Sequence, residues 1–167
     1  MRPVHTIALG LAALTCLSGQ AQAQVTKIEA NPPGMILQAA KVSAGTDMIF
    51  LSGQLASPID PNKTTKDITS FEDLGDTKTQ TISTLNKIKA ILAAQGYTMA
   101  DLVKLTLFVA PDPKTGKMDF AGANAGFREF FGTADNPTTV ARSAFQVAAL
   151  AGPYFLIEIE AIAAKKP

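Results

Sequence analysis

Residues 157–163 read IEIEAIA, and this alternation constrains the fold more than any other feature of the chain. A side-chain period of two is typical of a β-strand, whose successive side chains point to opposite faces of a sheet. One face would carry Ile157, Ile159, Ala161 and Ala163. The other would carry Glu158 and Glu160 between Leu156 and Ile162, so neither face is purely polar. We therefore expect a partner subunit to pack on the second face.

Arg142 lies in a second predicted strand, residues 140–148, which a short connection at residues 150–153 joins to the last strand as an antiparallel hairpin. Two interpretations of this arginine stay open. It could form a cross-strand ion pair with Glu158 or Glu160, which would contribute about 0.2–1 kcal/mol. Alternatively, its planar guanidinium, held by a strand, could receive the carboxylate of a small ligand in bidentate geometry.

The rest of the chain alternates between strand and helix patterns. Residues 73–95 place Ile82, Leu85, Ile88 and Leu92 on one helical stripe, and Gly96 follows as a C-terminal cap. A second helix begins after Asp119 and ends before Gly132. We interpret its stripe as core packing; the stripe is formed by Phe120, Ala123, Phe127 and Phe130.

Four further strands are predicted, at residues 25–30, 36–42, 48–53 and 102–109, and residues 57–70 are predicted to form a loop. The order of the elements indicates an α+β fold. We expect a mostly antiparallel six-stranded sheet with both helices on one face.

The first residues have the pattern of a secretory signal peptide. Arg2 is followed by an apolar run at residues 7–17 and by Ala21-Gln22-Ala23, a small-x-small cleavage motif. The run is shorter than the roughly 20 apolar residues that span a bilayer. We predict a signal peptide at residues 1–23, a single domain at residues 24–167, a periplasmic or secreted location, and no membrane attachment after cleavage.

Cleavage would remove the only histidine, His5, and the only cysteine, Cys16. The remaining domain could then form neither a Cys/His zinc site nor a Ser-His-Asp triad, and it would have no cysteine nucleophile or disulfide. Without Arg2 the formal charge is zero, since 14 basic residues balance 14 acidic ones. No basic cluster is present in the sequence, so we expect no nucleic-acid partner.

Four segments, in order, resemble the Rid family of enamine/imine deaminases, also called YjgF-like. They are Ser52-Gly53-Gln54, the NAGFREFF run at residues 124–131, residues 137–143 ending in Ala-Arg-Ser, and IEIEAIA at residues 157–163. The resemblance implies a chorismate-mutase-like fold and a homotrimer with ligand clefts between subunits. It also implies hydrolysis of reactive 2-enamine/2-imino acids to 2-oxo acids and ammonia, without a cofactor or metal.

By this resemblance Arg142 is the carboxylate-binding arginine, and Glu158 positions the attacking water. Ser52 and Gly53 line the same cleft, with Asn124 nearby. The family's usual cysteine is replaced by Ala144, whose backbone N–H remains. Its common early tyrosine is replaced by Ile36, which puts the choice of substrate side chain in question.

The residue types agree with this chemistry, because a positioned imine needs only an aimed water and no histidine or cysteine. Two alternatives remain. The same trimer could be a non-catalytic module that binds a small carboxylate. A chaperone-like or ribonuclease role has no support from the neutral charge and the lack of histidine in the domain, and it ranks last.

Overall fold

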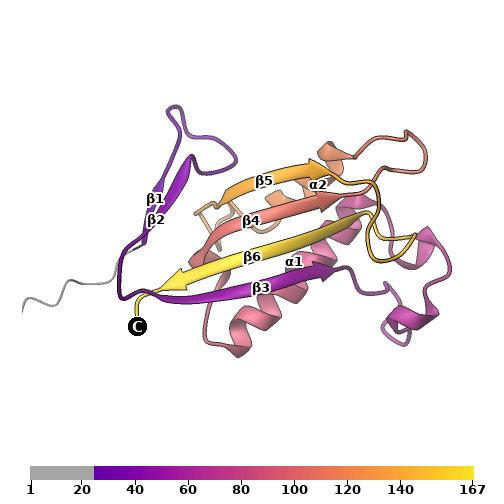
Figure 1. Ribbon diagram of the computed structural model, residues 1–167, viewed down its shortest axis with the longest axis horizontal. Helices are drawn as coiled ribbons and strands as arrows, with labels where there is room; N and C mark the ends of the chain where they lie inside the picture. Colours follow the sequence, from indigo (N-terminus) through magenta and orange to yellow (C-terminus); the bar gives the residue numbers. More distant parts are fainter. Residues whose placement is uncertain (1–24) are drawn as a thin grey trace, which may run out of the picture.

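The structure is a computed structural model that describes residues 25–167 (Figure 1). The predicted signal peptide, residues 1–23, lies outside the described residues. The strands and long helices are β1 (Val25–Ile28), β2 (Ala39–Val42), β3 (Asp47–Leu55), α1 (Thr77–Ala94), β4 (Leu102–Val109), α2 (Phe120–Arg128), β5 (Ala141–Gln146) and β6 (Ile157–Lys165). The connections include the 3-10 helices η1 (Thr65–Asp67), η2 (Phe71–Asp73) and η3 (Met99–Asp101).

The α+β fold is confirmed, but the single six-stranded sheet is wrong. The described strands form a four-stranded sheet in the order β3-β6-β4-β5 and a separate two-stranded sheet, β1-β2. β6 is antiparallel to both of its neighbours, whereas β4 and β5 are parallel. Figure 1 shows the small β1-β2 sheet beyond one end of the large sheet.

The predicted hairpin between the last two strands is also wrong, because β6 is paired with β3 and β4 and does not pair with β5. The intervening segment crosses the end of β4. At its start Val147 N donates to Val109 O at 3.0 Å, and at its end Leu156 O accepts from Ala110 N at 3.0 Å. A short connection therefore leads to a strand two positions away in the sheet.

Both helices cover the same face of the large sheet, as predicted; in Figure 1 they lie on its far side. The core between helices and sheet includes Leu85, Ile88 and Leu92 of α1, all fully buried. α2 can approach α1 closely because Gly126 has no side chain. A Cβ at that position would lie 2.7 Å from Thr81 Cβ.

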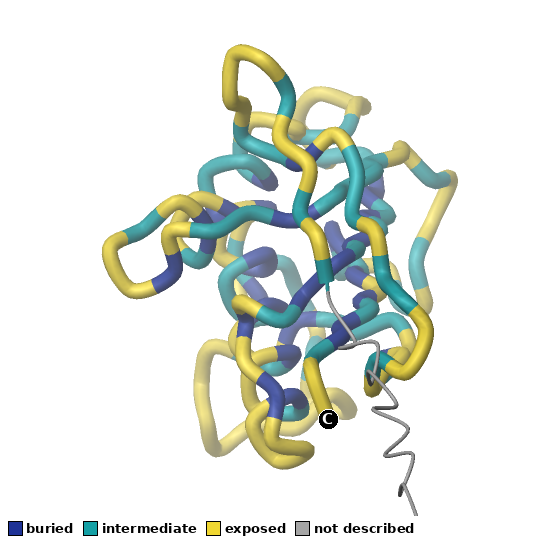
Figure 2. Tube along the Cα trace, turned by 90° about the vertical axis from the view of Figure 1, so that its left-hand side faces the viewer, coloured by how far each residue is buried: buried dark blue, intermediate teal, exposed yellow. Residues whose placement is uncertain are grey.

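The alternation predicted for the last strand is confirmed. Ile157, Ile159, Ala161 and Ala163 are buried against the helices, whereas Glu160 is exposed on the other face. That uncovered face also carries Phe50 and Phe145, which are 69% and 52% exposed. Figure 2 shows buried positions inside the fold and exposed positions mainly along the connecting loops.

Local sequence signals predict the start of α2 correctly, whereas the predicted start of α1 is a few residues too early. α1 begins after Asp76, whose side chain accepts a hydrogen bond from Thr79 N at 2.8 Å, whereas Asp73 belongs to η2. α2 begins after Asp119, as predicted, and that side chain accepts from Gly122 N at 2.8 Å. Among the described residues, no helix has the length and apolarity needed to cross a bilayer.

Candidate active site

Arg142 lies between the edge strand β5 and helix α2. It is in register with Leu105, a core residue of β4, so its side chain lies on the helix-covered face. The guanidinium carbon is 4.5 Å from the ring centroid of Phe127 and 5.7 Å from that of Phe120. These aromatic contacts favour the cation and fix the plane of the guanidinium.

The guanidinium has an incomplete set of polar partners. Nη2 donates a 2.7 Å hydrogen bond to Asn124 Oδ1, and Nη1 is buried without a partner in the described residues. No carboxylate of the described chain lies within ion-pair distance of Arg142. Burial lowers the pKa of this guanidinium, and the nearby cation Arg128 lowers it further. The site is therefore a partly desolvated cation suited to an external anion.

The cross-strand ion pair considered for Arg142 is wrong. Glu158 is in register with Phe108, and Glu160 with Thr106, on the uncovered face of the sheet. Arg142 instead faces the helices, and β4 separates its strand from β6. A guanidinium and a carboxylate on opposite faces of one sheet cannot neutralise each other.

The structure does bring Glu158 and Gly53 together. A bulge in β3 between Leu51 and Gln54 places Gly53 beside the start of β6. A Cβ on Gly53 would lie 1.8 Å from Glu158 Oε1, so the carboxylate can lie in this position because residue 53 has no side chain. A larger residue at position 53 would displace the Glu158 carboxylate.

Ser52 is exposed on the same uncovered face. It lines a hollow of about 300 Å³ together with Phe50, Lys104, Thr106 and Glu160. Within this hollow the Lys104 ammonium donates to Ser143 Oγ at 2.7 Å. Ser52 is thus placed on the Glu158 side of the sheet and away from Arg142.

Ala144 and Ile36 lie near the other half of the site. Ala144 follows Arg142 by two residues on β5 and so shares its face, where it packs on the core. Ile36 is partly buried against the same core. Its neighbours hold it beside the start of β5, since Leu37 N donates to Val140 O and Thr139 Oγ1 donates to Met35 O.

The predicted residues thus form two groups on opposite faces. Arg142, Asn124 and Ala144 lie on the helix-covered face, with Ile36 beside the start of β5. Glu158, Gly53 and Ser52 lie on the uncovered face.

Sequence reasoning missed the role of two phenylalanines. Phe120 and Phe127 were interpreted as core packing, but Phe120 is 43% exposed and both rings flank the guanidinium of Arg142. The sequence contained a signal for this role, because the spacing of Phe120, Asn124 and Phe127 places both phenylalanines on the same helical stripe as the predicted site residue Asn124. The stripe serves the site as well as the core.

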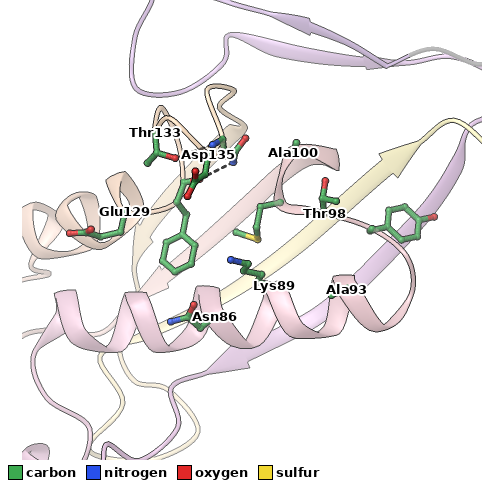
Figure 3. A pocket seen from close by; sticks show the side chains of 12 residues that line it. Asn86, Lys89, Ala93, Thr98, Ala100, Glu129, Thr133 and Asp135 are labelled. Carbon is green, nitrogen blue, oxygen red and sulfur yellow. Dashed lines mark hydrogen bonds between the residues drawn. The ribbon is translucent and has the colours of Figure 1, made fainter.

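A larger hollow lies elsewhere, between α1, the segment that leads into η3, and the segment that follows α2 (Figure 3). It measures about 620 Å³, and Figure 3 shows Asn86, Lys89, Glu129 and Asp135 around it. None of the predicted site residues lines it. The residues described here contain no group of three or more side chains that could hold a metal ion. The absence of metal and cofactor stays a prediction.

The fold and this site define an α+β protein with a partly buried guanidinium that has no carboxylate partner among the described residues. A family model described as "Endoribonuclease L-PSP" matches residues 36–165. The chain belongs to this family, which is also the Rid or YjgF family, so the resemblance seen in the sequence is confirmed.

Relatives match most of the chain. A RutC family protein of Pyrococcus horikoshii is 38% identical over 136 residues, covering 81% of this chain and 91% of the relative. A 2-iminobutanoate/2-iminopropanoate deaminase of Escherichia coli is 38% identical over 120 residues, covering 72% of this chain and 81% of the relative.

Two solved structures are similar. Escherichia coli TdcF with bound serine has 33% identity and a TM-score of 0.55, and the match covers 84% of this chain and 94% of that one. A Rid family protein of Yersinia pestis has a TM-score of 0.63 at 23% identity, covering 84% and 98%, and shows the shared fold.

Proposed function

We propose that this protein is a hydrolytic deaminase that converts reactive 2-enamine and 2-imino acids into 2-oxo acids and ammonia. The deaminase name of its 38% identical relative supports this reaction class. The single observation that carries the proposal is the Arg142 guanidinium, which is half-buried and has no carboxylate partner within the described residues.

Arg142 would bind the substrate carboxylate through its guanidinium, on which Nη1 has no partner among the described residues. Nη2 is hydrogen-bonded to Asn124, and the plane of the guanidinium is restrained by its contact with the Phe127 ring. The Arg142 side chain therefore has little conformational entropy left to lose on binding. A hydrogen bond to a charged group contributes about 1.5–3 kcal/mol, which makes this contact a main source of substrate affinity.

The chemical step needs an aimed water. The water oxygen adds to the imine carbon while the water loses a proton, and the imine nitrogen gains a proton to give a carbinolamine. The nitrogen takes up a further proton and leaves as ammonia as the C–N bond breaks, and the hydroxyl loses its proton to form the 2-oxo acid. Glu158 would orient this water and accept its proton. An enamine substrate is first protonated at carbon and loses a proton from nitrogen, which gives the imine.

A complete site would require two protomers, because Arg142 and Glu158 lie on opposite faces of one sheet. We propose a homotrimer in which the Arg142 side of one subunit meets the Glu158 side of the next. The uncovered sheet face supports this assembly, since Phe50 and Phe145 are exposed on it in the single chain. Head-to-tail contacts of this kind close into a three-membered ring when each contact rotates the next subunit by a third of a turn.

The test is the Arg142→Ala variant, assayed for ammonia release from 2-imino acids that an amino acid oxidase generates freshly. We expect deamination to fall to the uncatalysed rate while light scattering still shows the wild-type oligomer. Arg142→Lys should retain part of the activity, because it keeps the charge without the bidentate fork. Unchanged turnover by Arg142→Ala would remove the arginine from the mechanism.

A binding module is the second candidate, favoured by the relative that was solved with serine. Glu158→Gln separates the two functions. An enzyme should lose much more rate than affinity for a 2-oxo acid, whereas a binder should keep its affinity and have no turnover to lose.

We also propose that the domain works outside the cytoplasm, as the pattern at residues 1–23 indicates. Mass spectrometry of the protein recovered from the periplasm or medium should give a mature chain that starts at Gln24. A retained leader would contradict this location.

A further inference from the structure

A second guanidinium lies next to the Arg142 site. Arg128 is in the last turn of α2, one helical turn after Asn124, the residue that accepts the hydrogen bond from Arg142. Residues four apart lie on the same helix face, with Cβ atoms about 5–6 Å apart. Arg128 therefore projects from the same side of the helix that holds Arg142.

The helix geometry also gives the direction of Arg128. Gly126 faces α1, where it lies against Thr81. Successive residues of an α-helix are rotated by about 100° around its axis. This rotation places Gly126 on one side of the stripe formed by Phe120, Asn124 and Phe127, and Arg128 on the other side. Arg128 is therefore on the side of α2 away from α1, and its side chain is exposed to solvent.

The charges near Arg128 leave it free for an anion. The neighbouring Glu129 pairs with Lys78 at 3.3 Å, whereas Arg128 forms no ion pair with any described residue. Arg128 also acts on Arg142 electrostatically, since its charge helps to lower the pKa of the Arg142 guanidinium. Two like charges held together without an acid between them repel each other, and an anion that binds both relieves this repulsion.

We propose that Arg128 is a specificity-determining residue that binds a second anionic group of the ligand, so that the site prefers 2-imino dicarboxylates to imino acids with neutral side chains. This inference rests on the proposed deaminase function and deepens it. The carboxylate next to the imine carbon would bind Arg142, and the distal carboxylate would bind Arg128. Imines formed by oxidation of acidic amino acids have this chemistry.

The experiment compares kcat/KM for imines generated from aspartate or glutamate with kcat/KM for imines generated from alanine or leucine. The wild type should have the higher kcat/KM for the imines generated from aspartate and glutamate. Arg128→Gln should lower kcat/KM for the acidic imines by about three- to fivefold, the upper range for an exposed ion pair, and leave the neutral ones unchanged. Arg128→Lys should restore most of the preference, and added salt should weaken it.

Lys66→Gln is the matched control. Lys66 lies in η1 and is also exposed, so the variant changes the net charge equally without touching α2. A loss of preference in Arg128→Gln but not in Lys66→Gln would support a local contact. An equal effect of both variants would mean only a general charge effect and would overturn the proposal.

A binding measurement separates this proposal from the proposed function. Calorimetry can compare the affinity for 2-oxoglutarate with that for 2-oxobutanoate, and neither ligand requires turnover. Tighter binding of the dicarboxylate that is lost in Arg128→Gln supports Arg128 even if no imine is hydrolysed. Deamination of all imines with no dicarboxylate preference would overturn the Arg128 proposal and leave the deaminase proposal standing.

Discussion

Arg142 and Glu158 lie on opposite faces of the same sheet. Arg142 is in register with Leu105 of β4, and Glu158 is in register with Phe108 of the same strand, three residues further on. Because side chains alternate along a strand, the odd spacing places Leu105 and Phe108 on opposite faces. Their register partners, Arg142 and Glu158, therefore also lie on opposite faces. One protomer therefore cannot direct both groups at one small substrate.

The first prediction follows from this geometry. Arg142→Ala and Glu158→Gln protomers should each be inactive alone but should complement each other when they are unfolded together and refolded. In a head-to-tail trimer assembled at random from equal amounts, about a quarter of the sites would combine an intact arginine with an intact glutamate. Ammonia release should reach about that fraction of the wild-type value.

The control for this mixture replaces the Glu158→Gln protomer with the double variant Arg142→Ala/Glu158→Gln. That mixture contains no intact arginine and should stay inactive. Complementation that failed with correctly assembled trimers would contradict a site shared between protomers.

The sequence allowed much of this arrangement to be predicted, because its strongest signals are local. The alternation at residues 157–163 correctly separated the buried isoleucines from Glu158 and Glu160. Asp119 and Gly96 correctly marked helix ends. Each of these signals depends on neighbours a few residues away.

Strand pairing could not be predicted in the same way, because it depends on distant parts of the chain. The short connection before β6 suggested a hairpin, but β6 has a continuous buried face and lies between β3 and β4. β5 is shorter and more exposed, as an edge strand can be. The wrong pairing led directly to the wrong ion pair for Arg142.

Lys87 shows the same limit for a single residue. It lies outside the apolar stripe of α1, a position typical of a solvated helix face, but its ammonium donates to Leu55 O at 2.7 Å at the end of β3. Burial lowers the pKa of this lysine. The polar acceptor comes from 32 residues earlier in the chain, so no local pattern could reveal it.

The second prediction concerns the residue that holds Arg142. Asn124→Asp would place a carboxylate where Asn124 Oδ1 now accepts from Nη2 at 2.7 Å. The new ion pair would neutralise the guanidinium, so we expect the affinity for 2-oxobutanoate to fall by about tenfold or more. Calorimetry measures this loss.

Asn86→Asp is a matched control for this variant, since it adds the same charge on the exposed face of α1. It should leave the affinity within about twofold of the wild type, because an exposed distant charge is screened by salt. Unchanged affinity in Asn124→Asp would show that the ligand does not use this guanidinium.

The third prediction uses the contact between Gly53 and Glu158. In Gly53→Ala the new Cβ would lie 1.8 Å from Glu158 Oε1, so the carboxylate must move. The displaced atoms are the end of a flexible side chain, and we expect the free energy of unfolding to change by less than about 1 kcal/mol. The deamination rate should fall by at least about tenfold, because a misplaced general base loses its alignment.

Gly34→Ala gives the comparison for Gly53→Ala, since a Cβ at Gly34 would meet nothing closer than Ile36 O at 4.0 Å. It should keep wild-type rate and stability. If Gly53→Ala also kept the full rate, the present position of Glu158 would have no catalytic importance.

The fourth prediction is a pH dependence of stability that comes from the loop before α1. Asp73 accepts hydrogen bonds from Thr69 N at 2.9 Å and Ser70 N at 3.1 Å, and it pairs with Lys63. The Lys63 ammonium is the main cause that holds the pKa of Asp73 well below its usual range, and the backbone N–H groups add to it. In the unfolded chain the same carboxyl would titrate near its ordinary value of about 4.

The free energy of unfolding should fall at low pH, because the unfolded chain binds the proton before the folded protein does. As the pH falls through about 4, the unfolded chain takes up the proton while folded Asp73 stays ionised, so the free energy of the unfolded state falls relative to that of the folded state. The stabilisation by Asp73 is therefore complete above about pH 5 and decreases progressively below it. Asp73→Asn should destabilise the protein at pH 7, and the difference from the wild type in urea unfolding should shrink at pH 3. Lys63→Gln should weaken the same pH dependence, because it removes the largest contribution to the shift. An equal difference at both pH values would show that the ionisation of Asp73 does not contribute to the stability of the fold.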